Sequence, residues 1–342
     1  MRQVKISKLL EVCVVALLVL LALTRVAAAD APTIRFATQY GSASLPLLVM
    51  QHEKLIEKRA AADGRTLKVE WLKFGGGNVM NDALLSGNLD IATTGVTPLL
   101  TIWDKTKGSI GVKGLASLGS VPFVLVSTDP NVNSIKDIGP KDRIAVPAAK
   151  VSIQAIFLQM AAAQEFGASE ARKLDVYTVS MKHPDAVAAV VSGGSEVNGH
   201  ISSSPYYEYE LEKAKNARKV VSSLDVIGPA TNVALCATTK FYNDNPHNVR
   251  IVLGALDDAL EFISKHPRET AQIYKDVTRE SYPVDFLQKT VLAKDNVYKK
   301  TPEGFEKFAA YMHGAGLIQN QVSSWKDVFF PALYASSPTA SQ

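Results

Sequence analysis

Residues 75–98 read GGGNVMNDALLSGNLDIATTGVTP, and their layout recurs 107 residues later in residues 182–205, KHPDAVAAVVSGGSEVNGHISSSP. The matched positions are Asn78 and Asp185, Gly87 and Gly194, and Thr97-Pro98 and Ser204-Pro205. Each copy predicts an amphipathic helix, a glycine stop, a short strand, a polar turn and a second helix opened by a hydroxyl residue and proline. Three matches in register predict two lobes of one architecture.

Outside the repeat, short apolar strand candidates alternate with amphipathic helix candidates, as in α/β proteins with a mainly parallel sheet. The expected strands are 34–38, 67–72, 89–92, 121–127, 144–146 and 197–201, and the expected helices include 45–58, 248–263, 267–277, 283–292 and 302–315. Apolar stretches at 121–127 and 226–238 would carry the chain to the second lobe and back. We therefore expect lobe I at 30–122 and 230–342, lobe II at 123–229, and a cleft that opens and closes.

The first 29 residues have the pattern of a secretory signal peptide. Basic residues precede an apolar run of about a dozen residues, which is shorter than the roughly 18 to 20 that span a bilayer. Small residues end the segment, so we expect cleavage after Ala29 and export, which in a Gram-negative cell leads to the periplasm. The cleavage site has no cysteine, which argues against a lipid anchor.

The formal charge of +4 changes when this segment is removed. Four of the 37 basic residues and one of the 33 acidic residues lie within it, so the mature chain carries +1. This balance gives a nucleic-acid partner no electrostatic support. The mature chain keeps one cysteine, Cys236, which excludes an intrachain disulfide and is expected to be buried.

Motifs for catalysis, cofactors and metals are all incomplete. A metalloprotease helix would need histidine at Ile56, a nucleophile elbow would need glycine at Val197, and a dinucleotide fingerprint would need glycine at Met80. The six histidines are dispersed, without metal-ligand spacing. We therefore expect no enzyme activity, no cofactor and no metal.

Polar turns stand where predicted strands end and helices begin, at residues 38–42, 75–78, 93–97, 149–152 and 202–206. In open α/β sheets, ligands bind at this edge, where backbone N–H groups and helix dipoles favour anions and other acceptors. Such residues also cap helices and form turns without any ligand. As a set facing one cleft, they favour a site for a small polar molecule.

Several segments, in order and spacing, resemble a known family: 39–45, 51–58, 74–90, 94–98 and 134–146. They are similar to the periplasmic substrate-binding proteins of ABC transporters for nitrate, taurine, aliphatic sulfonates and thiamine-precursor pyrimidines, the NMT1/THI5-like family. The resemblance implies a two-lobed periplasmic binding protein fold of type II, with two hinge crossings, that delivers its ligand to a membrane permease. It also implies ligand contacts at Gln39, Tyr40, Ser42, Asn78, Gly95 and Thr97 in lobe I, and at Val151, Ser152, Ser203, Ser204 and Tyr206 in lobe II.

Two departures from the family bear on the ligand. Val96 and Ser204 stand where relatives often carry an acidic residue, so a neutral or anionic ligand, with Lys150 nearby, fits better than an amino-bearing one such as taurine. A pyrimidine-binding protein and a periplasmic sensor module remain open alternatives. An enzyme of the fungal pyrimidine-synthesising branch is a weaker one, because that branch depends on a Cys-rich motif and histidines that this chain lacks. A monomer is expected.

Overall fold

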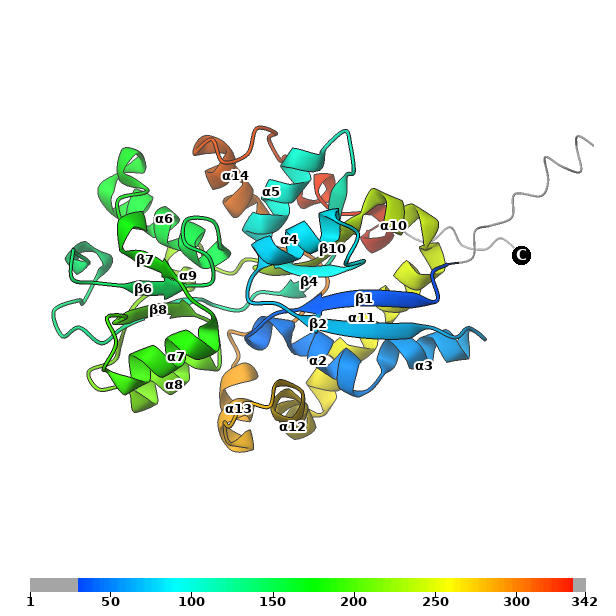
Figure 1. Ribbon diagram of the computed structural model, residues 1–342, viewed down its shortest axis with the longest axis horizontal. Helices are drawn as coiled ribbons and strands as arrows, with labels where there is room; N and C mark the ends of the chain where they lie inside the picture. Colours follow the sequence, from blue (N-terminus) through cyan, green and yellow to red (C-terminus); the bar gives the residue numbers. More distant parts are fainter. Residues whose placement is uncertain (1–29, 335–342) are drawn as a thin grey trace, which may run out of the picture. The chain divides into compact units, whose positions relative to one another are not determined.

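The computed structural model describes residues 30–334, apart from the side chain of Asn78. The expected signal peptide and its cleavage site lie outside the described residues. Within the described part of the chain, no helix has the length and apolar character needed to cross a membrane. The described residues form an α/β structure (Figure 1), so the predicted fold class is confirmed.

The first group of strands, which we call sheet system I, combines two small sheets. Its strands are β1 (Thr33–Thr38), β2 (Lys68–Lys73), β3 (Ala92–Gly95), β10 (Val233–Thr238) and β4 (Val112–Gly119). β1 and β2 pair in parallel, while β10 lies between β3 and β4 and is antiparallel to both. A bridge between Phe36 and Ile91 connects the two sheets, giving the order β2-β1-β3-β10-β4.

The second group, sheet system II, is one sheet of five strands in the order β7-β6-β8-β5-β9. These strands are β7 (Thr178–Ser180), β6 (Ile144–Val146), β8 (Gly199–Ser202), β5 (Val124–Ser127) and β9 (Arg218–Ser222). β5 is antiparallel to its two neighbours, as β10 is in system I. The starts of β3 and β8 are 107 residues apart, which matches the predicted offset.

Each system receives its antiparallel strand from a chain crossing. The chain leaves system I after β4, enters system II at β5, and returns through residues 227–232 to β10. The two systems therefore exchange chain twice, through neighbouring segments. This is the connectivity that the two expected crossings require.

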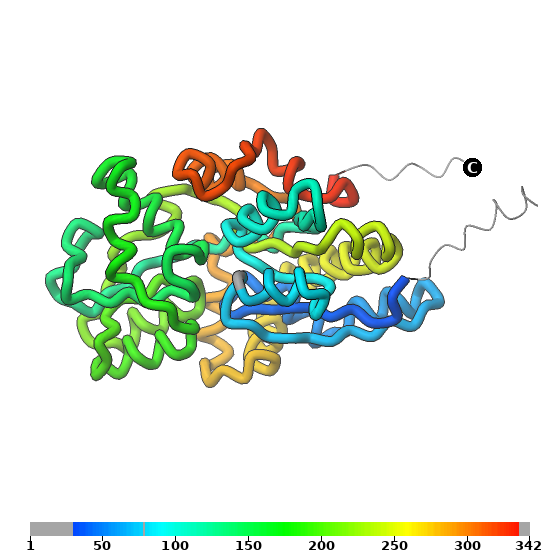
Figure 2. The backbone as a smooth tube through the Cα atoms, turned by 45° about the horizontal axis from the view of Figure 1, so that its top comes forward, coloured from blue at the N-terminus to red at the C-terminus, as the bar shows by residue number. Residues whose placement is uncertain are grey.

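Helices cover both faces of system I. On one face lie α2 (Leu45–His52), α3 (Leu55–Ala62), α11 (Pro246–Lys265), α12 (Pro267–Thr278) and α13 (Val284–Val291), and on the other α4 (Gly77–Leu85), α5 (Val96–Thr106) and α14 (Phe305–Gly314) (Figure 1). α14 runs beside α5, in orange next to cyan, in Figure 2. The C-terminal helices thus pack on strands formed by the N-terminal third of the chain.

System II has its own helices, α6 (Ile153–Phe166), α7 (His183–Ser192), α8 (Tyr206–Lys213) and the short α9 (Ser223–Val226). α6 lies on one face of the sheet, and α7 and α8 lie on the other (Figure 1). α4 and α7 are the repeated helices of the two copies. Each approaches the edge of its sheet at which the predicted polar turns stand.

Several predicted boundaries are wrong. The helix expected at 45–58 is two helices, because Lys54 adopts a left-handed conformation (φ 51°) between α2 and α3. The strand expected at 89–92 is Ala92–Gly95, whose Thr93 and Thr94 are fully buried. Their hydroxyls predict a turn, whereas β-branched threonines also suit a central strand.

Two predicted helix caps also shift. α4 begins at Gly77, one residue before Asn78, and its N-cap is Gly76. α5 begins at Val96 with Gly95 as its N-cap, so Thr97 lies inside the first turn. Glycine is accepted at the N-cap position, and at Gly95 the missing Cβ leaves room for Ile153, which would lie 3.2 Å away.

Candidate functional site

A cavity of about 30 Å³ lies where the two sheet systems meet. It is lined by Gln39, Tyr40, Ala43, Gly76, Gly77, Gly95, Pro98, Phe123, Pro147, Ser152, Ile153, Gln154, His183, Ser203 and Val233. Four helices begin at its wall: α4 and α5 from system I, and α6 and α7 from system II. Loop residues and the two chain crossings complete the lining.

Helix N-termini give this cavity its electrostatic character. The first N–H groups of a helix have no partner within the helix, and the helix dipole places partial positive charge there. Part of this capacity is already used, because the Val96 N–H of α5 donates to the carbonyl of Asn232 and Ser152 caps α6 by accepting from Ala155 N. Four N-termini around one cavity favour an anion with several acceptor atoms.

The nearest charged group to this wall that the described residues show is the Lys73 ammonium, which lies 4.1 Å from the centre of the Tyr40 ring. Among the described residues that line the cavity, none is a lysine, arginine, aspartate or glutamate. Lys150, expected nearby, has an exposed side chain outside the lining. An anion here would be held by backbone N–H groups, hydroxyls and amides, with His183 as the one lining side chain that can take a positive charge.

Two glycines lie where the two systems approach each other. A Cβ on Gly95 would lie 3.2 Å from Cγ2 of Ile153, and one on Gly41 (φ +92°) would lie 2.9 Å from Oγ of Ser203. A backbone hydrogen bond also crosses the boundary, from Ser42 N to Ser204 O at 2.9 Å. These contacts describe a closed arrangement.

Five of the predicted ligand residues line the cavity: Gln39, Tyr40, Gly95, Ser152 and Ser203. The structure brings these together from both systems, with residues 39–40 and Gly95 on one side and Ser152 and Ser203 on the other. Side chains and backbone of both repeat copies therefore contribute to one site.

The other predicted ligand residues are not among those that line the cavity. Thr97 is buried and its Oγ1 donates to the carbonyl of Val151 at 3.5 Å, while the Val151 side chain is 46% exposed. Asn78 is the second residue of α4, and its side chain lies outside the described part. Ser42 is fully buried and makes the backbone contact with Ser204.

Ser204 and Tyr206 belong to a polar cluster behind the cavity. Ser204 Oγ donates to Glu208 Oε1 at 2.5 Å, and Tyr206 OH donates to Glu280 Oε1 at 2.8 Å. Burial raises the pKa of both carboxyls, and the hydroxyl donors oppose that shift. Glu280 follows α12 of system I, so the Tyr206 bond holds the two systems together.

Comparison with known proteins identifies the family. The NMT1/THI5-like family model matches residues 63–270, which is more than half of the chain. The chain belongs to the NMT1/THI5-like family. No curated protein sequence matches it significantly.

Solved structures show what fold this family member has. The alkanesulfonate-binding protein SsuA from Xanthomonas axonopodis pv. citri, bound to MOPS, is 18% identical with a TM-score of 0.67, covering 86% of this chain and 97% of its own. The nitrate-binding protein NrtA from Synechocystis PCC 6803 is 14% identical with a TM-score of 0.65, covering 88% and 85%. A Candida albicans protein described as having the generic periplasmic binding protein fold is 15% identical with a TM-score of 0.61, covering 87% and 93%. These likenesses establish that fold for the NMT1/THI5-like chain.

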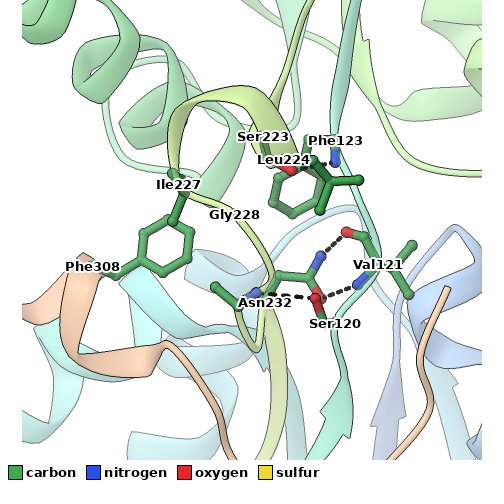
Figure 3. Close-up of a pocket in the computed structure, with 10 residues that line it drawn as sticks. Ser120, Val121, Phe123, Ser223, Leu224, Ile227, Gly228, Asn232 and Phe308 are labelled. Carbon is green, nitrogen blue, oxygen red and sulfur yellow. Dashed lines mark hydrogen bonds between the residues drawn. The ribbon is translucent and has the colours of Figure 1, made fainter. Parts of the chain in front are cut away.

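The two chain crossings run beside each other around a second, smaller pocket (Figure 3), and Phe123 lines both this pocket and the cavity. Asn232 joins them: its Nδ2 donates to the carbonyl of Val121, and its Oδ1 accepts from Val121 N at 3.3 Å. Phe123 N donates to Ser223 Oγ at 2.9 Å one step further along. Crossings of this kind, a few residues between regular elements, are the usual place for a hinge.

Sequence reasoning missed the most unusual part of the site. His183 lies against the cavity, and its Nδ1 is 2.8 Å from Nε2 of His200, whose Nδ1 is 2.5 Å from Glu210 Oε1. The spacing along the chain gives no sign of this cluster. The available signal is a titratable residue, His200, inside the buried strand β8, where a polar group needs a partner.

Proposed function

We propose that this NMT1/THI5-like protein is the periplasmic solute-binding component of an ABC importer. It captures a small anionic or polar organic molecule between lobe I (30–122 and 230–342) and lobe II (123–229), and delivers it to the membrane permease. The observation that carries this proposal is the convergence of four helix N-termini, two from each sheet system, on one cavity. The protein acts as a monomer and is exported by its cleavable leader.

The cavity favours a small anion over a cation. Helix N-termini repel positive charge, and no carboxylate lines the wall among the described residues to compensate a cation. The names of the structural relatives, an alkanesulfonate-binding and a nitrate-binding protein, support the same ligand class. Sulfonate and nitrate groups each present three acceptor oxygens to surrounding N–H donors.

Binding requires the lobes to move. A cavity of about 30 Å³ holds on the order of one or two water molecules. An organic anion therefore enters an open form, and the lobes close on it about the paired crossings. Closure excludes water and strengthens each N–H contact to the anion.

Thermal unfolding and calorimetry test the proposal with nitrate, ethanesulfonate, acetate and bicarbonate, set against choline and uracil. At 100 times its Kd, a ligand raises the free energy of unfolding by about 2.7 kcal/mol. We expect at least one anion to do this and choline to have no effect. Stabilisation by choline alone, or turnover of any of these compounds, would contradict the proposal.

A matched pair of serine variants locates the site. Ser203→Ala removes a hydroxyl at the cavity wall and is expected to weaken anion binding about 10- to 150-fold, from the roughly 1.5 to 3 kcal/mol of one hydrogen bond to a charged group. Ser202→Ala removes a buried neighbouring hydroxyl that has no partner among the described residues and lies outside the lining. Its affinity should match that of the wild type, and equal losses in both variants would argue against this wall.

A further inference from the structure

A continuous chain of side chains runs from the cavity into lobe II. Gln154 Nε2 lies 3.3 Å from His183 Nε2, and the two histidines and Glu210 continue the chain at 2.8 and 2.5 Å. All four residues are buried, with Glu210 and His200 fully so. They come from α6, α7, β8 and α8, so only the folded lobe assembles them.

The direction of the hydrogen bonds follows from the chemistry of each group. A neutral imidazole has one donor and one acceptor nitrogen. With Glu210 ionised, His200 donates from Nδ1 and accepts at Nε2, so His183 donates from Nδ1. The acceptor nitrogen of His183 is then Nε2, which faces the amide donor of Gln154 beside the cavity. In this form the hydrogen-bonded row of His183, His200 and Glu210 carries one buried negative charge.

Little in the surroundings compensates that charge. Glu210 Oε2 has no hydrogen-bond partner among the described residues, and the Glu210 carboxyl helps to raise the pKa of Glu208 and of Tyr282, neither of which can carry a positive charge. On the other side, Tyr206 stacks on His183 at 5.3 Å and directs its hydroxyl to Glu280.

Two charged residues stand close to His183 along the sequence, Lys182 directly before it and Asp185 in the first turn of α7. The side chain of Lys182 runs along Gly75 across the boundary. His183 also opens α7, where the helix dipole opposes a positive ring. Burial and the neighbouring His200 lower the pKa of His183 well below its usual range, so the ring is neutral without a ligand.

An anion in the cavity changes this balance. It would face a second negative charge, on Glu210, across two neutral rings in a site that excludes water, where charge interactions are strong. A proton on His183 Nε2 removes that repulsion, since the His183–His200–Glu210 chain becomes neutral. It also turns the nitrogen at the cavity from an acceptor into a donor for the anion.

We propose that the cavity takes its anion together with one proton, which the His183–His200–Glu210 chain holds while the anion is bound. This inference rests on the proposed function. The proton comes from solvent and adds to His183 Nε2, which gives up its hydrogen bond from Gln154 as the amide turns. It returns to solvent when the anion leaves, and no covalent bond other than this N–H forms or breaks.

The linkage between proton binding and anion binding predicts how Kd depends on pH. The bound anion increases the affinity of His183 for a proton and so raises its pKa. By linkage, the proton on His183 increases the affinity for the anion by the same factor. At a pH between the free and the bound pKa, Kd rises about tenfold per pH unit, because one proton is taken up per anion. Below that interval the proton is already present, and above it the anion binds without one.

Isothermal titration calorimetry with ethanesulfonate and with nitrate tests this, since both anions stay ionised from about pH 6 to about pH 8.5. Tris and bis-Tris serve as buffers, because these amines differ in protonation enthalpy and do not compete as anions. We expect an observed enthalpy that depends on the buffer, with uptake approaching one proton, and a Kd that rises with pH. Binding with a buffer-independent enthalpy and a flat Kd would overturn the proton inference alone. If neither anion binds, the proposed function fails and this inference fails with it.

Glu210→Gln distinguishes the proposal from a structural defect, because the two predict opposite changes in the affinity for the anion. The variant lacks the buried charge, so we expect no proton uptake, a flat Kd, and binding at least tenfold tighter than the wild type at about pH 8.5. Weaker binding at every pH would show a structural role and overturn the proposal. Glu212→Gln is the matched control, because Glu212 lies on the same helix, half-exposed and paired with Lys213. It should keep the wild-type pH dependence.

Nitrogen NMR of the histidine rings tests the wild type without any variant. Without anion, His183 Nε2 should show the shift of an unprotonated nitrogen, and saturating ethanesulfonate should move it to that of a protonated one. A ring that stays unprotonated in the bound protein would overturn the proposal.

Discussion

Gly95→Ala places one methyl group at the boundary between the lobes. Gly95 has φ −59° and ψ 150°, which any residue adopts, so the backbone bears no strain. The new Cβ would lie 3.2 Å from Cγ2 and 3.3 Å from Cβ of Ile153, and 3.4 Å from Cδ of Pro98. Ile153 belongs to the other lobe, is buried, and is stiff at χ1 because it is β-branched.

The size of the effect follows from these contacts. Overpacking a close-packed site costs about 1 to 3 kcal/mol, and we take the lower part of that range because Ile153 must give by only a few tenths of an ångström. The open form avoids the contact altogether, so the cost falls on closure. We therefore expect anion binding to weaken about 5- to 30-fold, which corresponds to about 1 to 2 kcal/mol.

Calorimetry with the best-binding anion measures this loss, and urea unfolding of the ligand-free protein measures stability. We expect ligand-free stability within about 0.5 kcal/mol of the wild type, because the methyl group has room once the lobes separate. Gly139→Ala is the control, since a Cβ there has no atom within 4 Å. An unchanged Kd in Gly95→Ala, or the same loss in both variants, would refute closure at this contact.

Two further predictions concern the hydrogen bond between Tyr206 and Glu280 and the thiol of Cys236. Tyr206→Phe removes the hydrogen bond to Glu280 across the lobes and leaves a buried carboxyl with one donor fewer. We expect about 10- to 150-fold weaker anion binding by calorimetry, from the roughly 1.5 to 3 kcal/mol of a lost hydrogen bond to a charged group. Burial raises the pKa of Cys236 to about 12, so a disulfide reagent at about pH 8 should leave the native protein unlabelled and label it fully in guanidinium chloride.

Controls separate each effect from a general disturbance. Tyr334→Phe changes a partly exposed tyrosine and should leave Kd unchanged. If Tyr206→Phe binds as the wild type does, the Tyr206–Glu280 bond plays no part in closure. Rapid labelling of native Cys236 would show that β10 opens without unfolding.

The fold could be predicted because its signals are local and repeated. Alternating apolar segments indicated the α/β class, and the 107-residue offset of the matched turns reappears in β3 and β8. The errors occurred where one residue type serves two purposes. Thr93 and Thr94 look like turn residues but fill a central strand, and Lys54 ends a helix whose apolar spacing continues.

The site could be predicted only as far as backbone topology determines it. Polar turns at strand ends must meet in this fold, and that logic placed Gln39, Ser152 and Ser203 at one cavity. The contact of His183 with His200 depends instead on how α7 packs on β8. No spacing in the sequence encodes that packing, so the proton chain became visible only in three dimensions.

The central claim is that one anion is held by helix N-termini of both lobes at once. A backbone amide NMR titration with ethanesulfonate tests it most directly. The account predicts that the largest shifts appear together at the amides of Gly77 in lobe I and of Ile153, Gln154 and His183 in lobe II, with one common Kd. Shifts confined to one lobe, or centred away from these four amides, would contradict it.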